Sequence, residues 1–446
     1  MKTAYLLGIG GAGMAGLAQL LQQKGISVRG YDRKESVTTA HLEGLGFSID
    51  YTPHPSRLEK ADICVYSAAI PKDFPLLQYA NKTLPTVSRG EMMGRLQREF
   101  PKSVAVAGTH GKTTTVGMIT QIAKCAGQDP SVLIGGQFSA IGGYGHFGSS
   151  PLLICEACEY AGSFLHLTPT IGVLLNIDRD HLECYGSYKN LKEGFGSFLH
   201  NCQTCVVNGG NPSWVQAAKE HPSVTLFGKN GELTAQNLQE TKGFFGFTLC
   251  RGEQALGTLQ LQVPGKHQVE NALAAATVGF LLGCSFQHIK EGLEAFSGVD
   301  RRFQIHYQDN TLTVADDYAH HPTEIAAVLT TAKRMGFSSI TAVFQPFTYS
   351  RTALLCREFA GALSLANKVI LAPVMAGREP PIPGVSSQSI AEYLPSVTLC
   401  QSLSHCTAVA LQQAQKGELI LTLGCGNVNE CALEMAGFLK KHNCHA

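Results

Sequence analysis

Residues 103–115 read Ser-Val-Ala-Val-Ala-Gly-Thr-His-Gly-Lys-Thr-Thr-Thr. The apolar, β-branched segment Ser103–Ala107 predicts a buried strand, and a helix is expected over Thr113–Cys125. The glycines between them let backbone N–H groups wrap a polyphosphate where the helix begins. The stretch therefore predicts a nucleotide-binding α/β domain of the P-loop type, although Val106 occupies the position of the first glycine in the usual eight-residue pattern.

The side chains of this turn have distinct expected tasks. Lys112 can reach between the β- and γ-phosphates of ATP, and the Thr113 hydroxyl is placed to ligate Mg²⁺. Glu156 and His181 each follow a predicted strand, at 152–155 and 171–175. Both would emerge at the carboxyl ends of parallel strands, where α/β folds bind ligands, so they are candidates to share metal ions with Thr113. Mg²⁺ rarely takes imidazole, which makes His181 the weaker candidate.

A second glycine turn lies near the amino terminus. Gly10, Gly11, Ala12 and Gly13 follow a predicted strand and open a predicted helix, and Asp32 lies 19 residues after Gly13. This spacing is typical of a dinucleotide fold, in which the turn holds a diphosphate and the acid accepts from a ribose or a base. Ser67, after the predicted strand 63–66, completes this predicted site.

Strand and helix patterns alternate along much of the chain, which predicts parallel sheets in three α/β domains. We expect a Rossmann-like domain over 1–98, a central P-loop-type ATPase domain over 99–297 and a second Rossmann-like domain over 298–446. Because a simple dehydrogenase needs one nucleotide site and no γ-phosphate clamp, two glycine turns imply two nucleotides.

Composition excludes several classes of protein. With 35 Lys and Arg against 34 Asp and Glu, the formal charge of +1 provides no basic field for nucleic acid. The apolar run 272–284 is too short to span a bilayer, so no membrane insertion and a cytoplasmic location are expected. The 15 cysteines are sparse and odd in number, which favours reduced thiols over a disulfide framework or a zinc site at the close pairs Cys155/Cys158 and Cys202/Cys205.

Several ordered motifs resemble those of the Mur ligases. They are Gly108–Thr114, Glu156–Glu159, Asn176–His181, His267–Asn271, Asp300–Phe303 and Asp317–Pro322. The stretches Gly8–Met14, Phe344–Arg351 and Arg378–Gly384 are similar to the branch that adds L-alanine. The resemblance covers the whole chain in order.

The resemblance implies an ATP-dependent ligase of peptidoglycan precursor synthesis, and hence a role in cell-wall biogenesis and cell division. The first domain would hold UDP-N-acetylmuramate, the second MgATP and the third L-alanine. The lactyl carboxylate would attack the γ-phosphate to give an acyl phosphate, which the amine of L-alanine would then attack. Lys112, Glu156 and His181 would be the catalytic residues, with one Mg²⁺ on Thr113 and Glu156 and a second on His181.

The resemblance also assigns residues to each substrate. ATP would be bound by the turn residues Gly108, Thr109, His110, Gly111, Lys112, Thr113 and Thr114 together with His267, Asn271, Arg302 and Asp317. The amino acid and the acyl group would be bound by His320, His321, Tyr349, Arg351 and Arg378. Closure of the third domain would complete the site and exclude water.

Some positions depart from the family pattern. Cys158 replaces an acidic residue, which leaves Glu159 as an uncertain helper, and Gln268 stands where many relatives have Asn. Phe347-Thr348 replaces a His-Arg pair of some relatives. Phe195 lies 14 residues after His181, where sister enzymes that add later amino acids carry a modified lysine. That last departure agrees with the alanine-adding branch.

Three alternatives remain open from the sequence. A recycling ligase that joins a whole murein tripeptide to the same sugar nucleotide shares nearly all the motifs. A nicotinamide-dependent oxidoreductase is supported only by the first glycine turn, and a non-catalytic UDP-sugar sensor would not need Lys112, Glu156 and His181 together. We expect a monomer or a weak homodimer.

Overall fold

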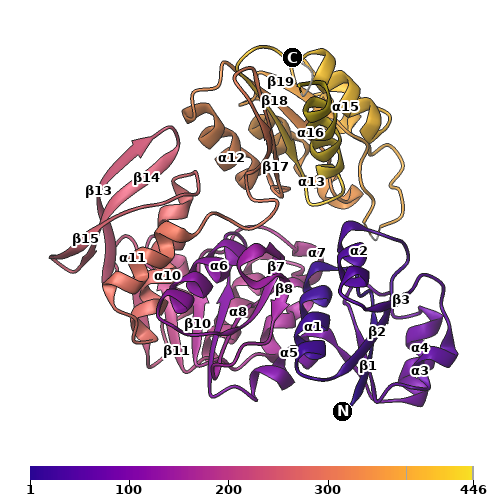
Figure 1. Cartoon of the computed structure of the whole chain (residues 1–446), viewed down its shortest axis with the longest axis vertical. Helices are drawn as coiled ribbons and strands as arrows, with labels where there is room; N and C mark the ends of the chain where they lie inside the picture. The colour runs from indigo at the N-terminus through magenta and orange to yellow at the C-terminus, as the bar shows by residue number, and fades with distance from the viewer. Residues whose placement is uncertain (378, 444–446) are drawn as a thin grey trace. The chain divides into compact units, whose positions relative to one another are not determined.

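The computed structural model describes residues 1–377 and 379–443, which form an α/β protein built on three sheets (Figure 1). They divide into two compact units. The first comprises Met1–Leu238, Phe247–Gln262 and Val269–Val299, and the second comprises Gln239–Gly246, Val263–Gln268 and Asp300–Ala446. The predicted fold class is confirmed, whereas the domain boundaries at 98/99 and 297/298 stay predictions.

The amino-terminal sheet has five parallel strands in the order β3-β2-β1-β4-β5. Its elements are β1 (Thr3–Leu7), α1 (Ala12–Gln23), β2 (Ser27–Tyr31), α2 (Val37–Gly44), β3 (Ser48–Asp50), α3 (Pro55–Leu58), β4 (Ile63–Tyr66), α4 (Pro75–Thr83), β5 (Thr86–Ser88) and α5 (Arg89–Gln97). Because β2 and β4 flank β1, the chain order reverses at β1, the point at which α/β sheets bind ligands beyond the carboxyl ends of their strands. The first glycine turn begins there.

The central sheet has ten strands in the order β15-β14-β13-β12-β11-β10-β6-β9-β7-β8. Its strands are β6 (Lys102–Ala107), β7 (Ser131–Phe138), β8 (Gly143–His146), β9 (Leu152–Glu156), β10 (Ile171–Leu174), β11 (Thr204–Asn208), β12 (Val224–Phe227), β13 (Leu233–Thr241), β14 (Phe244–Arg251) and β15 (Gln254–Gln260). Strands β7, β9, β6, β10, β11 and β12 are parallel, and β8 is an antiparallel edge. The apolar strands β10, β6 and β9 are buried on both faces, as parallel sheets require.

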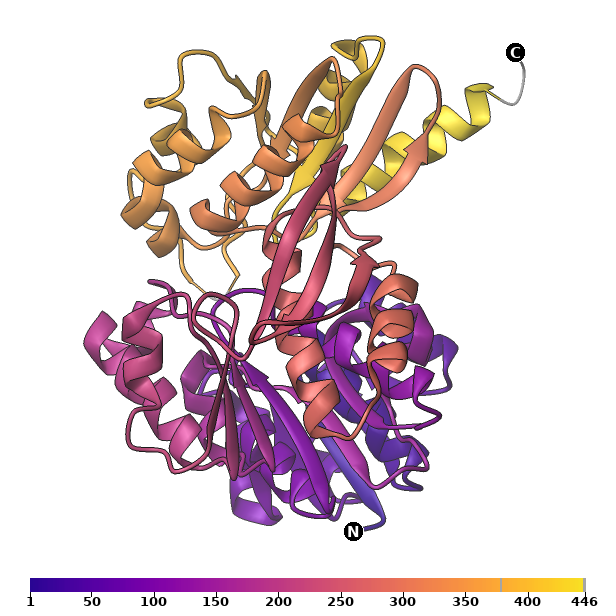
Figure 2. The ribbon, with the colours of Figure 1, turned by 90° about the vertical axis from the view of Figure 1, so that its left-hand side faces the viewer.

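Helices cover both faces of the central sheet. They are α6 (Lys112–Cys125), α7 (Leu182–Tyr185), α8 (Tyr188–His200), α9 (Pro212–Ala217), α10 (His267–Leu281) and α11 (Phe286–Ala295), with short 3-10 turns η1 (Ser139–Ile141) and η2 (Tyr160–His166). Figure 2 shows the magenta helices around residue 190 and the salmon helices around residue 280 on opposite sides of the strands. Helix α6 is the helix predicted from Thr113, and it begins one residue earlier than predicted, at Lys112.

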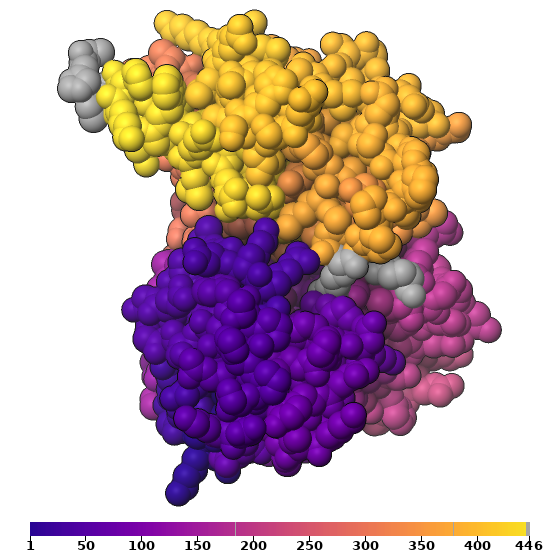
Figure 3. Space-filling view, turned by 90° about the vertical axis from the view of Figure 1, so that its right-hand side faces the viewer, coloured from indigo at the N-terminus to yellow at the C-terminus, as the bar shows by residue number. Residues whose placement is uncertain are grey.

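The amino-terminal sheet packs directly on the central domain within the first unit. Helix α1 contacts β7 and β8 at a pair of glycines. A Cβ on Gly16 would lie 2.5 Å from the Tyr144 carbonyl oxygen, and one on Gly145 would overlap the Gly16 carbonyl oxygen. Only glycine permits this approach, and Figure 3 shows the first hundred residues, in indigo, seated against the central domain.

The second unit contains a six-stranded sheet in the order β16-β17-β21-β18-β19-β20. Its elements are β16 (Gln304–Gln308), β17 (Leu312–Asp317), α12 (Pro322–Arg334), β18 (Ser339–Phe344), α13 (Tyr349–Leu363), β19 (Lys368–Leu371), α14 (Gln388–Ala391), β20 (Thr398–Leu399), α15 (Leu403–Gln412), β21 (Glu418–Leu423) and α16 (Asn429–Asn443). All strands are parallel except β16, which forms an antiparallel hairpin with β17. Strands β17 and β18 both border β21, so the loops that follow them leave from the same edge.

The structure also bears on the cysteines and on membrane-spanning helices. Every described cysteine is a free thiol, which agrees with the predicted reduced state. Within the residues that the structure describes, no helix is both long enough and apolar enough to cross a membrane.

Candidate functional site

The predicted phosphate turn after β6 is braced by the neighbouring strand β10. Gly108 and Gly111 have backbone φ of 143° and 85°, which side chains disfavour. The Asn176 side chain accepts the His110 N–H at 2.8 Å and donates to the His110 carbonyl at 3.0 Å. The Thr109 N–H donates to the Asn176 carbonyl at 3.2 Å. Residues 108–114 therefore form one turn whose shape depends on the segment after β10.

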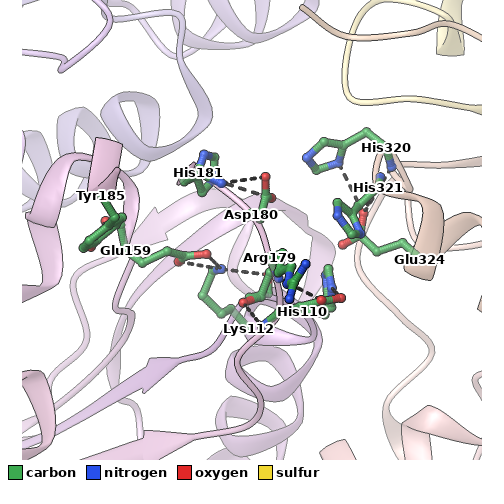
Figure 4. A network of polar contacts seen from close by, with 12 residues as sticks. His110, Lys112, Glu159, Arg179, Asp180, His181, Tyr185, His320, His321 and Glu324 are labelled. Atoms are coloured by element: carbon green, nitrogen blue, oxygen red, sulfur yellow. Dashed lines mark hydrogen bonds and ion pairs between the residues drawn. The ribbon is translucent and has the colours of Figure 1, made fainter. Parts of the chain in front are cut away.

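Lys112 opens α6 and points into the mouth of this turn (Figure 4). Its ammonium donates to the carbonyls of Gly108 and Thr109 at 2.5 and 3.1 Å and to both carboxylate oxygens of Glu159 at 3.1 and 2.9 Å. Burial alone would lower the pKa of Lys112, but the Glu159 carboxylate, helped by Glu156, raises it above its ordinary value. The ammonium is therefore held charged where a phosphate would meet the turn.

Glu156 ends β9, which lies beside β6. The Gly135 N–H donates to Glu156 Oε1 at 2.5 Å, and a Cβ on Gly135 would lie 2.9 Å from both carboxylate oxygens. Among the described residues, Glu156 Oε2 has no hydrogen-bond partner. Thr113, in the first turn of α6, adds a nearly buried hydroxyl from the adjacent strand–helix unit. A carboxylate and a hydroxyl are hard oxygen donors, so this pair fits Mg²⁺.

His181 lies on the loop after β10, just before α7. Its backbone φ of 53° is uncommon for a residue with a side chain. The ring lies 5.1 Å from that of Tyr160, and Nε2 is 3.7 Å from Asp180 Oδ2 (Figure 4). Tyr160 and Asp180 thus orient the imidazole, at the edge of the sheet from which α6 and Lys112 also begin. As a ligand for Mg²⁺ it fits less well than the oxygen donors.

Two residues of α10 were predicted to lie near the adenine. Asn271 lies directly against the phosphate turn, because a Cβ on Gly111 would be 2.5 Å from Asn271 Oδ1. His267 is the first residue of the helix, and its ring lies beside Gly265, whose φ is 114°. The missing side chain at Gly111 therefore leaves the space that the Asn271 side chain occupies.

The residues predicted to bind the UDP-sugar meet beyond β1. The Gly10 N–H donates to Asp32 Oδ2 at 2.8 Å, and the Arg33 N–H donates to Asp32 Oδ1 at 2.8 Å. A Cβ on Gly8 would lie 3.2 Å from Ser67 Cβ, which places Ser67 beside the turn. Gly11 is the amino-terminal cap of α1, and Ala12 and Gly13 follow it in the first turn. Asp32 thus contacts the turn through Oδ2, while its Oδ1 accepts from the backbone of the next residue.

In the second unit, Asp317 ends β17 and accepts two backbone hydrogen bonds. Phe303 N–H donates to Oδ2 and Ala319 N–H to Oδ1, both at 2.8 Å. Burial raises the pKa of Asp317 to about 6, although the Arg302 charge opposes the rise. The Arg302 guanidinium lies 5.2 Å from the centre of the Tyr318 ring. The predicted pair Arg302 and Asp317 is thus assembled at the carboxyl end of β17.

The residues predicted around the amino acid follow β17 and β18. His320 Nδ1 lies 3.3 Å from Glu324 Oε2 (Figure 4), and His321 caps α12. Tyr349 and Arg351 lie in the first turn of α13, after Thr348, whose φ of 65° is rare for a β-branched residue. The structure therefore brings these four predicted residues to one edge of the sheet. Arg378 lies outside the described residues.

Three site residues had no role assigned from sequence alone. Asn176 braces the turn, Gly135 holds Glu156, and Glu159, an uncertain helper, is the ion-pair partner of Lys112. Asn176 and Glu159 lie within motifs that resemble the family, and that was their only signal. Gly135 follows the apolar run 132–134, and nothing in that run indicated its contact with a carboxylate.

Family comparisons cover nearly the whole chain. Residues 3–101 match the Mur ligase family, catalytic domain, residues 106–279 match the Mur ligase middle domain, and residues 301–426 match the Mur ligase, glutamate ligase domain. A protein of Acetivibrio thermocellus named UDP-N-acetylmuramate–L-alanine ligase is 37% identical over 447 residues, which cover 96% of this chain and 94% of that protein.

Solved structures show the same fold. The crystal structure of UDP-N-acetylmuramate-alanine ligase from Thermotoga maritima is similar with a TM-score of 0.85 and 26% identity, over 99% of both chains. A murein peptide ligase from Psychrobacter arcticus is similar with a TM-score of 0.76 and 21% identity, over 98% of this chain and 99% of that one, which concerns the fold alone. On the strength of these matches along its length, the chain belongs to the Mur ligase family.

Proposed function

We propose that the chain joins L-alanine to the lactyl carboxylate of UDP-N-acetylmuramate, with ATP converted to ADP and phosphate, in the synthesis of peptidoglycan precursors. The observation that carries the proposal is the Lys112 ammonium at the mouth of a braced phosphate turn, beside the carboxylates of Glu159 and Glu156. The name of the relative that matches 96% of the chain supports the choice of substrates.

The reaction needs charge neutralisation more than covalent help from the protein. A carboxylate oxygen attacks the γ-phosphorus, the bond to the ADP oxygen breaks, and an acyl phosphate forms. The amine of L-alanine then attacks the carbonyl carbon. A proton leaves the nitrogen, the carbon–oxygen bond of the tetrahedral intermediate breaks, and phosphate departs. Lys112 offsets the charge of the phosphoryl group in transfer, and the N–H groups at the start of α6 would hold the remaining phosphates.

We also propose the residues that would hold the metal ions and the nucleotide. Thr113 and Glu156 would hold one Mg²⁺ and His181 a second, and the ions would neutralise phosphate charge when bound. His267 and Asn271 would contact the adenine, while Arg302 and Asp317 would serve the phosphates and the ribose. Asn271 already lies against Gly111, which supports its place at the nucleotide.

The two other substrates are assigned to separate sheet edges. Gly10, Gly11, Ala12 and Gly13, with Asp32 and Ser67, would bind the UDP part of UDP-N-acetylmuramate. His320, His321, Tyr349 and Arg351 would surround the amino acid and the acyl group, and Arg378 is proposed with them. The first four of these lie on loops after neighbouring strands of one sheet.

Phe195 supports the alanine-adding reaction. Its side chain is fully buried on α8 and lies 5.2 Å from the ring of Phe164. A modified lysine at this position would have to leave a charged group in an apolar cluster, which is strongly unfavourable. The protein therefore differs at a core position from the sister enzymes that add later amino acids.

Phosphate release from MgATP tests the proposal directly. It would be followed with UDP-N-acetylmuramate and L-alanine, with UDP-N-acetylmuramate and the murein tripeptide, and with UDP-N-acetylmuramate alone. We expect release only when the sugar nucleotide and L-alanine are both present. Dependence on the tripeptide instead would establish the recycling ligase, and oxidation of NADH without formation of ADP would establish an oxidoreductase.

A further inference from the structure

Arg89 is a cation at an unfavourable position, and its guanidinium has no hydrogen-bond or ion-pair partner among the residues that the structure describes. It is the first residue of α5, where the helix dipole disfavours positive charge. Its helix is already capped by Ser88, whose side chain accepts the Glu91 N–H at 3.1 Å. Among the described residues, no carboxylate or carbonyl accepts a hydrogen bond from the Arg89 guanidinium. A residue that breaks a local rule without an internal gain often serves a ligand.

The guanidinium faces the first glycine turn. A Cβ on Gly13 would lie 3.0 Å from Arg89 Nη1, 3.3 Å from Cζ and 3.5 Å from Nε. Arg89 therefore covers Gly13, one residue beyond Ala12 in the first turn of α1. The N–H groups of Ala12 and Gly13 have no carbonyl partner within the helix, whereas the Met14 N–H donates to the Gly11 carbonyl at 2.8 Å. An anion held by them would also meet the guanidinium.

Helix α5 is held in place by close contact with η2, within the same unit. A Cβ on Gly90 would lie 3.1 Å from Ser163 Cα, and one on Gly94 would overlap the His166 carbonyl oxygen. Since η2 begins directly after Glu159, the backbone of Arg89 is held beside the strand end that carries Glu156. The guanidinium is therefore carried on a rigid helix next to the glycine turn.

We propose that Arg89 binds the diphosphate of the sugar nucleotide over the turn Gly11–Gly13. Its planar fork can donate two hydrogen bonds to phosphate oxygens, which a lysine cannot reproduce. This inference rests on the proposed function, because it assigns the ligand to the sugar-nucleotide site. It makes Arg89 a binding residue that orients the substrate, with the reacting carboxylate directed toward Lys112.

Arg89→Ala tests the assignment, with Arg98→Ala, an exposed cation at the other end of α5, as its matched control. We expect Arg89→Ala to raise KM for UDP-N-acetylmuramate and the inhibition constant of UDP by the same factor, about tenfold or more, as for loss of a charge-assisted hydrogen bond. The value of kcat should stay within about twofold of the wild type, as for loss of uniform binding. For Arg89→Lys, we expect KM and the inhibition constant to lie between those of the wild type and those of Arg89→Ala.

Other outcomes would overturn it. A higher KM with unchanged inhibition by UDP would place Arg89 at the lactyl carboxylate, and a lower kcat with unchanged KM would place it at the reacting groups. Unchanged constants, or no inhibition of the wild type by UDP, would remove the diphosphate contact. Calorimetric binding of UDP to wild type and Arg89→Ala measures the contact without turnover. A wild type that binds UDP but forms no amide would therefore count against the proposed function and leave the Arg89 comparison intact.

Discussion

The Lys112 ammonium and the Glu159 carboxylate form an ion pair of 2.9 Å in which the side chains are only 15% and 3% exposed. Glu159 lies three residues after Glu156, so the segment that follows β9 supplies both a candidate metal ligand and the partner of Lys112. A buried pair of this kind is costly to break, because removal of one partner leaves the other charge uncompensated. The pair therefore links the stability of the turn to its chemistry.

Lys112→Met should separate the two effects. We expect kcat to fall by about 100-fold or more, because the phosphoryl group loses its cation. The melting temperature should also fall, since Glu159 keeps a buried charge without a partner, at a cost of about 3–5 kcal/mol. In the double variant Lys112→Met/Glu159→Gln, the melting temperature should recover while activity stays lost. A single variant with wild-type turnover would contradict the role of Lys112.

Glu156→Gln should change the dependence on metal. The amide keeps the bond from the Gly135 N–H but loses the charge that would hold Mg²⁺. The Mg²⁺ concentration at half-maximal rate should rise by about tenfold or more. Glu193→Gln, on the exposed face of α8, serves as the control and should leave this Mg²⁺ concentration unchanged. An equal response of both variants would show that Glu156 is not a ligand.

Asp317 should make stability depend on pH in a defined window. Its folded pKa of about 6 lies above the ordinary 3.8, so its protonated form is favoured in the folded state. Its contribution to stability is therefore complete below about pH 4 and is lost as the pH rises to about 6. Relative to Asp317→Asn, the wild-type melting temperature should fall across this window and stay level above it. A difference that is constant from pH 4 to pH 8 would refute the shifted pKa.

Gly145→Ala should loosen the contact between the amino-terminal sheet and the central domain. The added methyl would overlap the Gly16 carbonyl oxygen, so the backbones must separate, at a cost of about 1–3 kcal/mol. Gly44→Ala in α2 is the control, because a Cβ there meets no atom within 4 Å. It should be neutral or slightly stabilising. Equal melting temperatures for the two variants would contradict the close approach.

Local patterns in the sequence predicted much of the fold. The strand 103–107, the glycine turn and the helix from Thr113 could be predicted because their signals lie within neighbouring residues, and the structure moves the helix start only to Lys112. The hairpin at Asp309-Asn310 and the helix that begins at Pro322 carry local signals of the same kind. Turn chemistry and proline geometry act over a few residues, so one sequence suffices to detect them.

Contacts between distant segments could not be predicted in this way. The pairing of Lys112 with Glu159 joins residues 47 positions apart, and Asn176 braces a turn 66 residues before it. Asp32 was expected to serve a ribose or a base, and its link to the Gly10 N–H depends on the pairing of β1 with β2. Such contacts depend on strand order, which no local pattern specifies.

An isotope experiment tests the central claim, that an acyl phosphate links ATP to the amide bond. UDP-N-acetylmuramate labelled with ¹⁸O in both lactyl carboxylate oxygens would be converted with MgATP and L-alanine, and the phosphate would be analysed by mass spectrometry. Because the attacking oxygen becomes the bridge to phosphorus, we predict one ¹⁸O atom in each phosphate released and one in the amide product. Phosphate without ¹⁸O would show that the carboxylate never attacked the γ-phosphate and would contradict the account.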